Sequence, residues 1–198
     1  MQAAIDVFRI SVSRARHLSG LHSAITSLTT AAVDPSDLLR AQIVLAVSAL
    51  DYFVHEITVL GMIEIFEGKR LSTDAFNRYK VSAGLLIGAS ASKSAAFEED
   101  IRERHSFLSF QQPDKIADAV RNFYSEPLWR NVSMQLGIPE VAVKNHLRLI
   151  VDRRNKIAHE ADADPSFPGE RWPITTSDAD NALSFVEKVC EAIYLLAK

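Results

Sequence analysis

The sequence contains few residues that cross-link or interrupt a chain. Its one cysteine, Cys190, excludes an internal disulfide, and its apolar helical setting makes it most simply a small core residue. There are only seven glycines and seven prolines, and no Asn-Gly or Asp-Gly pair separates alternating apolar runs. Apolar residues recur at helical spacing instead, so the sequence predicts an all-α fold.

Charge of one sign and long apolar runs are also scarce. The 22 basic and 25 acidic side chains leave a net charge of −3, so any site for a polyanion must be a local patch. The most apolar stretch, 38–50, is interrupted by polar residues and soon followed by Asp51, which predicts that it is too short and too polar to span a bilayer. No basic stretch leads into an apolar run at the N-terminus. We therefore expect a cytoplasmic protein without a membrane segment.

Motifs for metals and phosphate-binding loops are missing. The sequence has no cysteine pair and no histidine-glutamate zinc spacing. Gly84 and Gly88 lack the Lys-Ser or Lys-Thr that follows in a P-loop. We expect neither a metal nor a cofactor.

Four long segments with helical periodicity form the expected core of a single domain over 1–198. Between the second and third long segments the helical periodicity is interrupted, which predicts short helices inserted over about 70–137. This insertion should include a loop within 84–94 and a charged helix over about 95–110. The second long helix is apolar nearly all round and should lie at the centre. The expected architecture is an antiparallel helical bundle with short helices inserted in its middle. The four core helices are predicted at about 3–29, 35–67, 139–160 and 177–197.

Phosphate-binding and proton-transfer chemistry is densest near the end of the third long helix, in Arg154-Asn155-Lys156-Ile157-Ala158-His159. Arginine grips phosphate, an amide orients a hydroxyl, and histidine moves a proton near neutral pH. At 100° per residue, Arg154 projects from within an apolar stripe, where a guanidinium is costly unless an anion or acceptor meets it. That partner is either an internal carboxylate or a ligand phosphate. The predicted stripe is Leu147, Ile150, Val151, Ile157 and Ala158, and the adjoining face carries Arg148, Asp152, Asn155 and His159.

Several polar residues near the motif have two interpretations. Asp51 and His55, one turn apart in the second helix, either support Arg154 or His159, or form a self-satisfied buried pair. Arg154 and His159 themselves are either functional or the salt-bridged end of a helix. Other neighbours have simpler predictions: Arg153 and Glu160 should form a solvated pair on the opposite side, and Asp162 and Asp164 would repel a phosphate if they faced the site.

The six-residue stretch resembles the signature of the HEPN superfamily (higher eukaryotes and prokaryotes nucleotide-binding domains), an arginine followed by a polar residue and then a histidine about a turn later. Leu38-Leu39-Arg40 leading into Ser48-Ala49-Leu50-Asp51-Tyr52-Phe53-Val54-His55-Glu56 is similar to the early long helix of its RiboL-PSP-like subgroup, found in prokaryotic conflict systems. Residues 70–137 add nothing to the resemblance.

The resemblance implies a metal-independent endoribonuclease of a toxin or defence type, in which the RNA 2′-hydroxyl attacks its own phosphate. Arg154 would bind the phosphate oxygens, Asn155 would orient a reacting group, and His159 would act as general acid or base. Supporting roles would fall to Asp51, His55, Arg148 and Asp152.

One histidine is poorly placed to serve both the nucleophile and the leaving group, so we expect a homodimer that shares its site. The implied partners are RNA and a separate antitoxin or defence-system protein. The alternative is a non-catalytic module for nucleotide binding, dimerisation or regulation.

Overall fold

The structure of the protein is a computed structural model that describes residues 1–30, 32–87 and 93–198. Nine helices and no β-strand are found in these ranges, which confirms the all-α class. The long helices begin and end within one residue of the predicted bounds. In chain order the helices are α1 (Gln2–Leu28), α2 (Ser36–Phe66), α3 (Asp74–Asn77), α4 (Ala83–Ile87), α5 (Lys93–His105), α6 (Pro113–Val120), α7 (Leu128–Leu136), α8 (Glu140–His159) and α9 (Thr176–Ala197).

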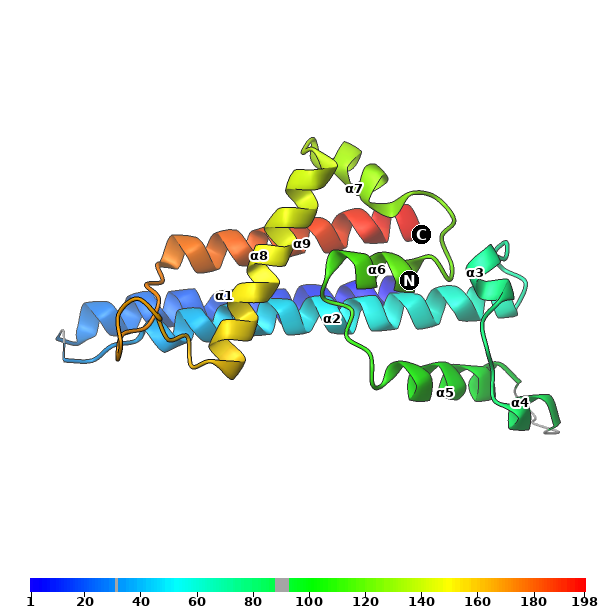
Figure 1. Ribbon diagram of the computed structural model, residues 1–198, viewed down its shortest axis with the longest axis horizontal. Coiled ribbons are helices and arrows are strands. Elements are labelled where there is room, and N and C mark those ends of the chain that lie inside the picture. Colours follow the sequence, from blue (N-terminus) through cyan, green and yellow to red (C-terminus); the bar gives the residue numbers. More distant parts are fainter. Residues whose placement is uncertain (31, 88–92) are drawn as a thin grey trace.

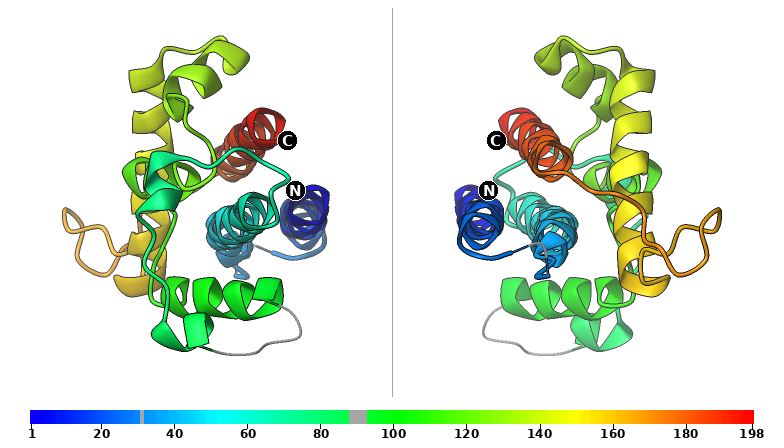
Figure 2. Two further views of the ribbon diagram at one scale, coloured as in Figure 1. Left: turned by 90° about the vertical axis from the view of Figure 1, so that its right-hand side faces the viewer. Right: turned by 90° about the vertical axis from the view of Figure 1, so that its left-hand side faces the viewer.

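Helix α2 lies at the centre of the fold, as its apolar surface predicts. It contacts α1, α9, α8, α5 and α6. Figure 1 shows α1, α2 and α9 lying side by side along the long axis, with α1 running opposite to the other two, while α8 crosses them steeply. Figure 2 shows α8 on one side of this group and α5 on another. The end of α8 that carries the motif therefore passes beyond the three aligned helices.

The apolar length of α2 exceeds the stretch 38–50 expected from the sequence. By length and composition Ser36–Phe66 is long enough to cross a membrane, so that expectation was wrong on length. The core helix of a soluble protein passes the same test, and 56% of the most apolar window is buried inside the protein. Neighbouring helices thus account for the composition of α2.

Helix α1 buries one face over most of its length, but its C-terminal end is largely exposed. Ile5, Phe8, Val12 and Ala15 are buried, whereas Leu21 and Leu28 are 48% and 83% exposed. The reason lies in α9, which begins near this level: the Ser19 hydroxyl donates to Asp180 at 3.2 Å. The C-terminal end of α1 therefore extends past the start of α9 and is not covered by it.

The middle of the chain, predicted as an insertion over about 70–137, packs on the rest of the protein in two parts. Residues of its second half, such as Ile116, Phe123 and Trp129, belong to the main hydrophobic core. Its first half packs on the far end of α2 through a separate cluster of Val59, Met62, Phe97 and Ile101. The loop predicted within 84–94 lies partly outside the described residues, and α4 occupies Ala83–Ile87.

Helix α5 ends at His105, five residues before the predicted end at Phe110. Phe110 instead leaves the helix, buries its ring to 5% exposure and donates its backbone N–H to the Asp51 carboxylate at 2.6 Å. Since a buried aromatic and a charge-assisted hydrogen bond outweigh weak helix propensity, tertiary contact ends the helix here. This shorter helix leaves residues 106–112 as a loop beside α2 and α8.

Candidate functional site

The motif lies on the last two turns of α8, where the helix passes out of the core. Leu147, Ile150 and Val151 are buried as predicted, and Ile157 is half-buried. Ala158, predicted to be buried, is exposed because the end of the helix projects past its neighbours. Along this same stretch Arg154 and Asn155 are half-buried and His159 is exposed. The helix therefore presents its chemical groups near solvent.

Arg154 is held by a neutral acceptor. Its Nη2 donates to Oε1 of Gln111, from the loop that follows α5. Over the described ranges of the chain, every other arginine is either ion-paired within 4.0 Å or well exposed, whereas Arg154 is half-buried and lies within that distance of no described carboxylate. Of the two partners expected for Arg154, the internal carboxylate is thus not found among these residues.

Asp51 reaches Arg154 indirectly, through Gln111. The Asp51 Oδ2 accepts from Nε2 of Gln111 at 2.9 Å, and its Oδ1 accepts from the Phe110 backbone. A continuous chain of hydrogen bonds therefore runs from α2 to the guanidinium on α8. Asp51 thus contacts both the residue that holds Arg154 and His55, and its supporting role stays a prediction.

His55 lies beside this chain of hydrogen bonds and packs against an aromatic ring. Its Nε2 is 3.8 Å from Asp51 Oδ1, and its ring centroid is 4.4 Å from that of Phe110. In the described part of the chain it forms no hydrogen bond, ion pair or ring contact with Arg154 or His159. His55 thus supports the segment that carries Gln111, while Asp51 makes the polar link.

Arg148 and Asp152 lie on the predicted adjoining face but turn toward the start of α6. Arg148 Nη2 is 3.4 Å from Asp114 Oδ2, and Gln112 Nε2 is 3.4 Å from Asp152 Oδ1. Hydrogen bonds of this length are weak. The structure therefore brings these two residues to residues 112–114 and not to Arg154 or His159.

Asn155 and His159 share one helix face, a turn apart, as predicted. Within the described ranges neither side chain has a hydrogen-bond or ion-pair partner. His159 thus forms no ion pair among these residues, although its place in the last turn of α8 suits the negative end of the helix dipole. An amide and an imidazole with free polar atoms are available next to a guanidinium without a counter-charge.

Arg153 was predicted to form a solvated pair with Glu160, and that prediction is wrong. Its Nη2 donates to Asp162 Oδ2 at 2.8 Å and lies 3.2 Å from the carbonyls of Trp172 and Pro173. Arg40 donates to the same carboxylate oxygen at 2.7 Å. Asp162 is 0% exposed, so one buried carboxylate is shared by two arginines.

A tight reversal of the chain after α8 produces this arrangement. Ala161 and Asp162 both adopt left-handed backbone conformations, with φ of 52° and 57°. Such angles are unfavourable for side-chain-bearing residues, and the surrounding contacts must hold them. The reversal carries Asp162 back beneath α8, and Asp164 is also buried, at 8% exposure. Asp162 accepts from Arg40 and Arg153, and Asp164 accepts from the Ser166 backbone, so among the described residues neither carboxylate bonds to Arg154, Asn155 or His159.

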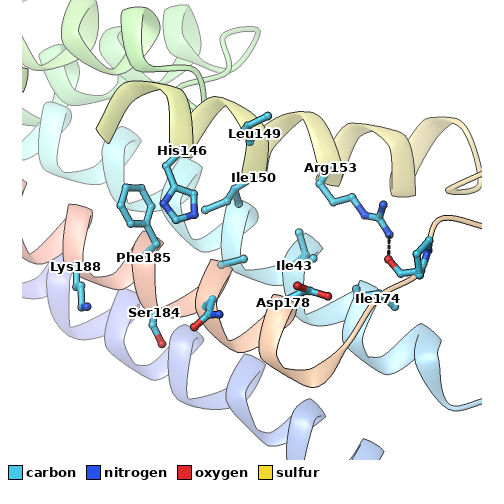
Figure 3. A pocket seen from close by; sticks show the side chains of 13 residues that line it. Ile43, His146, Leu149, Ile150, Arg153, Ile174, Asp178, Ser184, Phe185 and Lys188 are labelled. Atoms are coloured by element: carbon cyan, nitrogen blue, oxygen red, sulfur yellow. Dashed lines mark hydrogen bonds between the residues drawn. The ribbon is translucent and has the colours of Figure 1, made fainter. Parts of the chain in front are cut away.

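A groove of about 660 Å³ lies on another side of α8, between α8 and α9. Figure 3 shows the His146 and Phe185 rings face to face at one end, with centroids 4.0 Å apart, and Arg153 at the other end pointing toward the segment before α9. Arg154, Asn155 and His159 do not line it. The motif is therefore presented on an open helix face, separate from this groove.

Sequence analysis did not find Gln111, although it is the residue that contacts Arg154. It precedes Gln112 and Pro113 in a stretch without periodicity or motif, so no local signal marks it. Within the part of the chain that the structure describes, no group of three or more histidine, cysteine, aspartate or glutamate side chains is placed to hold a metal ion.

Comparison with protein families supports the resemblance first noted from the motif. The family described as RiboL-PSP-HEPN matches residues 10–198, which includes the segment 70–137 as well as the motif. No match was found among curated proteins, and none among solved structures. Because the family match spans nearly the whole sequence and contains the Arg154–His159 motif on a long helix, the chain belongs to the RiboL-PSP-HEPN family of the HEPN superfamily.

Proposed function

We propose that this protein is a metal-independent endoribonuclease of a prokaryotic toxin or defence type. Its family is associated with nuclease and RNA-related roles, which supports the choice of RNA as substrate. The single observation that carries the proposal is the state of Arg154, a half-buried guanidinium held by an amide and without a carboxylate among the described residues. A partly desolvated cation of this kind favours an anionic ligand such as a phosphodiester.

The chemistry follows from the side chains beside Arg154. The 2′-oxygen of the RNA loses its proton to a base and bonds to the adjacent phosphorus. The bond from phosphorus to the 5′-oxygen breaks, and that oxygen takes up a proton. The products are a 2′,3′-cyclic phosphate and a free 5′-hydroxyl. His159 transfers protons, Arg154 stabilises the charge that develops on the phosphate, and Asn155 orients a reacting group.

A homodimer would supply what one chain lacks. The reaction needs both a base and an acid, and each chain offers one histidine in the motif. Two α8 helices related by a two-fold axis would bring a second His159 and a second Arg154 to one site. The exposed position of His159 at the end of a projecting helix is compatible with such pairing. We further propose a cytoplasmic location and control by a separate antitoxin or defence-system partner protein.

The alternative is a non-catalytic module in which the same residues bind a nucleotide or join two chains. An uncompensated Arg154 would favour a nucleotide phosphate as much as an RNA phosphate. Tight nucleotide binding without turnover of RNA would support this second function.

RNA cleavage in the presence of a chelator tests the proposal. His159→Ala should lower the rate at least about 100-fold, the scale of general acid–base catalysis, and the wild-type products should carry 2′,3′-cyclic phosphate ends. His146→Ala is the matched control, because it removes an exposed histidine from the same helix on another face and should retain wild-type activity. Equal cleavage by wild type and His159→Ala would remove the catalytic assignment.

A further inference from the structure

Gln111 bridges the Asp51 carboxylate and the Arg154 guanidinium, which a side chain that only donates or only accepts hydrogen bonds could not do. A carboxylate only accepts hydrogen bonds, and a guanidinium only donates them. A bridging side chain must therefore donate at one end and accept at the other, which a carboxamide does. The partners fix its orientation: the –NH₂ faces Asp51 at 2.9 Å and the carbonyl oxygen faces Arg154.

The bridge keeps negative charge one side chain away from Arg154. The preceding residue, Arg153, illustrates the contrasting case, because its guanidinium contacts the buried Asp162 carboxylate directly and shares it with Arg40. Arg154 instead meets a neutral oxygen, so its charge and its remaining N–H groups stay available to an anion. The same helix thus holds one structural arginine and one arginine oriented without charge compensation.

The loop that carries Gln111 is anchored from two helices. The Phe110 ring is 4.4 Å from His55 of α2 and 5.5 Å from His105 of α5, and its N–H binds Asp51. His105 is buried, with its Nε2 3.4 Å from the Tyr79 hydroxyl. Burial, together with the nearby His55, lowers the pKa of His105 to about 4, so this support is uncharged near neutral pH. Gln111 is therefore held in place independently of Arg154.

We propose that Gln111 is a positioning residue of the ribonuclease site, which orients the Arg154 guanidinium for a phosphate while keeping the Asp51 charge from neutralising it. This inference rests on the proposed function for its substrate. It also gives the middle of the chain, which carried no recognisable motif, a direct role in the site.

A charge-relocation experiment separates this role from a purely structural one. In the double variant Asp51→Asn with Gln111→Glu, residue 51 donates to residue 111, which still accepts from Arg154, so the hydrogen bonds and the net charge are kept. The negative charge now contacts Arg154 directly. We expect the KM for RNA to rise about tenfold or more with an unchanged melting temperature. Wild-type KM in a folded double variant would overturn the proposal.

A second measurement does not depend on catalysis. Gln111→Ala should leave the Arg154 side chain mobile, seen as a fall in the ¹⁵N heteronuclear NOE of its Nε–H group, while the signal of Arg153 stays as in wild type. An unchanged Arg154 signal would overturn the positioning role. If wild type cleaves no RNA, the proposed function fails, and this NMR result still decides the role of Gln111.

Discussion

Two consecutive arginines in one helix turn have different environments, because Arg153 contacts a carboxylate and two backbone carbonyls whereas Arg154 contacts a neutral amide. Arg153 and Arg40 surround the fully buried Asp162, whereas Arg154 meets the amide of Gln111. A buried carboxylate with two guanidinium partners stabilises the fold, because removing either partner leaves the buried charge with less compensation. A cation held by an amide keeps the capacity to bind an anion.

Stability measurements should separate these roles. Arg40→Ala should lower the free energy of unfolding by about 3–5 kcal/mol, because Asp162 stays buried with less compensation. Arg154→Ala should cost only about 1 kcal/mol, since it removes a single bond to a neutral acceptor. Urea denaturation of both variants measures the difference. Equal destabilisation would mean that Arg154 is structural, contrary to the proposed site.

At the scale of helices, close packing around α2 determines which positions can carry a side chain. Gly61 of α2 lies directly against Phe123, and a Cβ atom at this position would be 2.3 Å from Phe123 Cγ. Phe123 is itself 2% exposed and has little room to move. Gly20 of α1, in contrast, has nothing within 4 Å of the corresponding position. Two helical glycines thus have different reasons to be present.

The same substitution should therefore have opposite effects at the two positions. Gly61→Ala should destabilise the protein by about 1–3 kcal/mol through overpacking. Gly20→Ala should stabilise it by about 0.5–1 kcal/mol, because alanine restricts the unfolded chain and suits a helix. Thermal unfolding of the two single variants provides the comparison. A neutral Gly61→Ala would show that α2 and Phe123 can separate without cost.

At the scale of the whole molecule, we propose that two chains share the site. Among the residues that the structure describes, Asn155 and His159 at the end of α8 have no hydrogen-bond or ion-pair partner, which is compatible with the proposed approach of a second chain. The steep crossing of α8 over α1, α2 and α9 is what carries this end out of the core (Figure 1). Function would then depend on the concentration of the protein as well as on its fold.

Dilution tests the shared site. Sedimentation should give a species of twice the 22.0 kDa chain mass, and RNA cleavage per chain should fall as dilution converts it to monomer. An inert carrier protein at constant total concentration controls for general loss on dilution. Constant activity per chain across the dimer-to-monomer transition would place a complete site in each chain and contradict sharing.

Patterns among residues close in sequence determined the positions of the long helices and the family of this protein. Periodic apolar residues placed the four long helices, the all-round apolar character of α2 put it at the centre, and the motif identified the family. These signals are readable because helix periodicity and motif spacing involve residues close in sequence.

Only the tertiary structure decided which partners the polar groups meet. The left-handed turn at Ala161 and Asp162 gave Arg153 its buried carboxylate, and the early end of α5 brought Gln111 to Arg154. The extent of α9 left Leu28 exposed. Each of these outcomes depends on residues that are far apart in sequence. Their approach is set by side-chain packing and by the cost of burying unpaired charge, and these two effects leave no local pattern in the sequence.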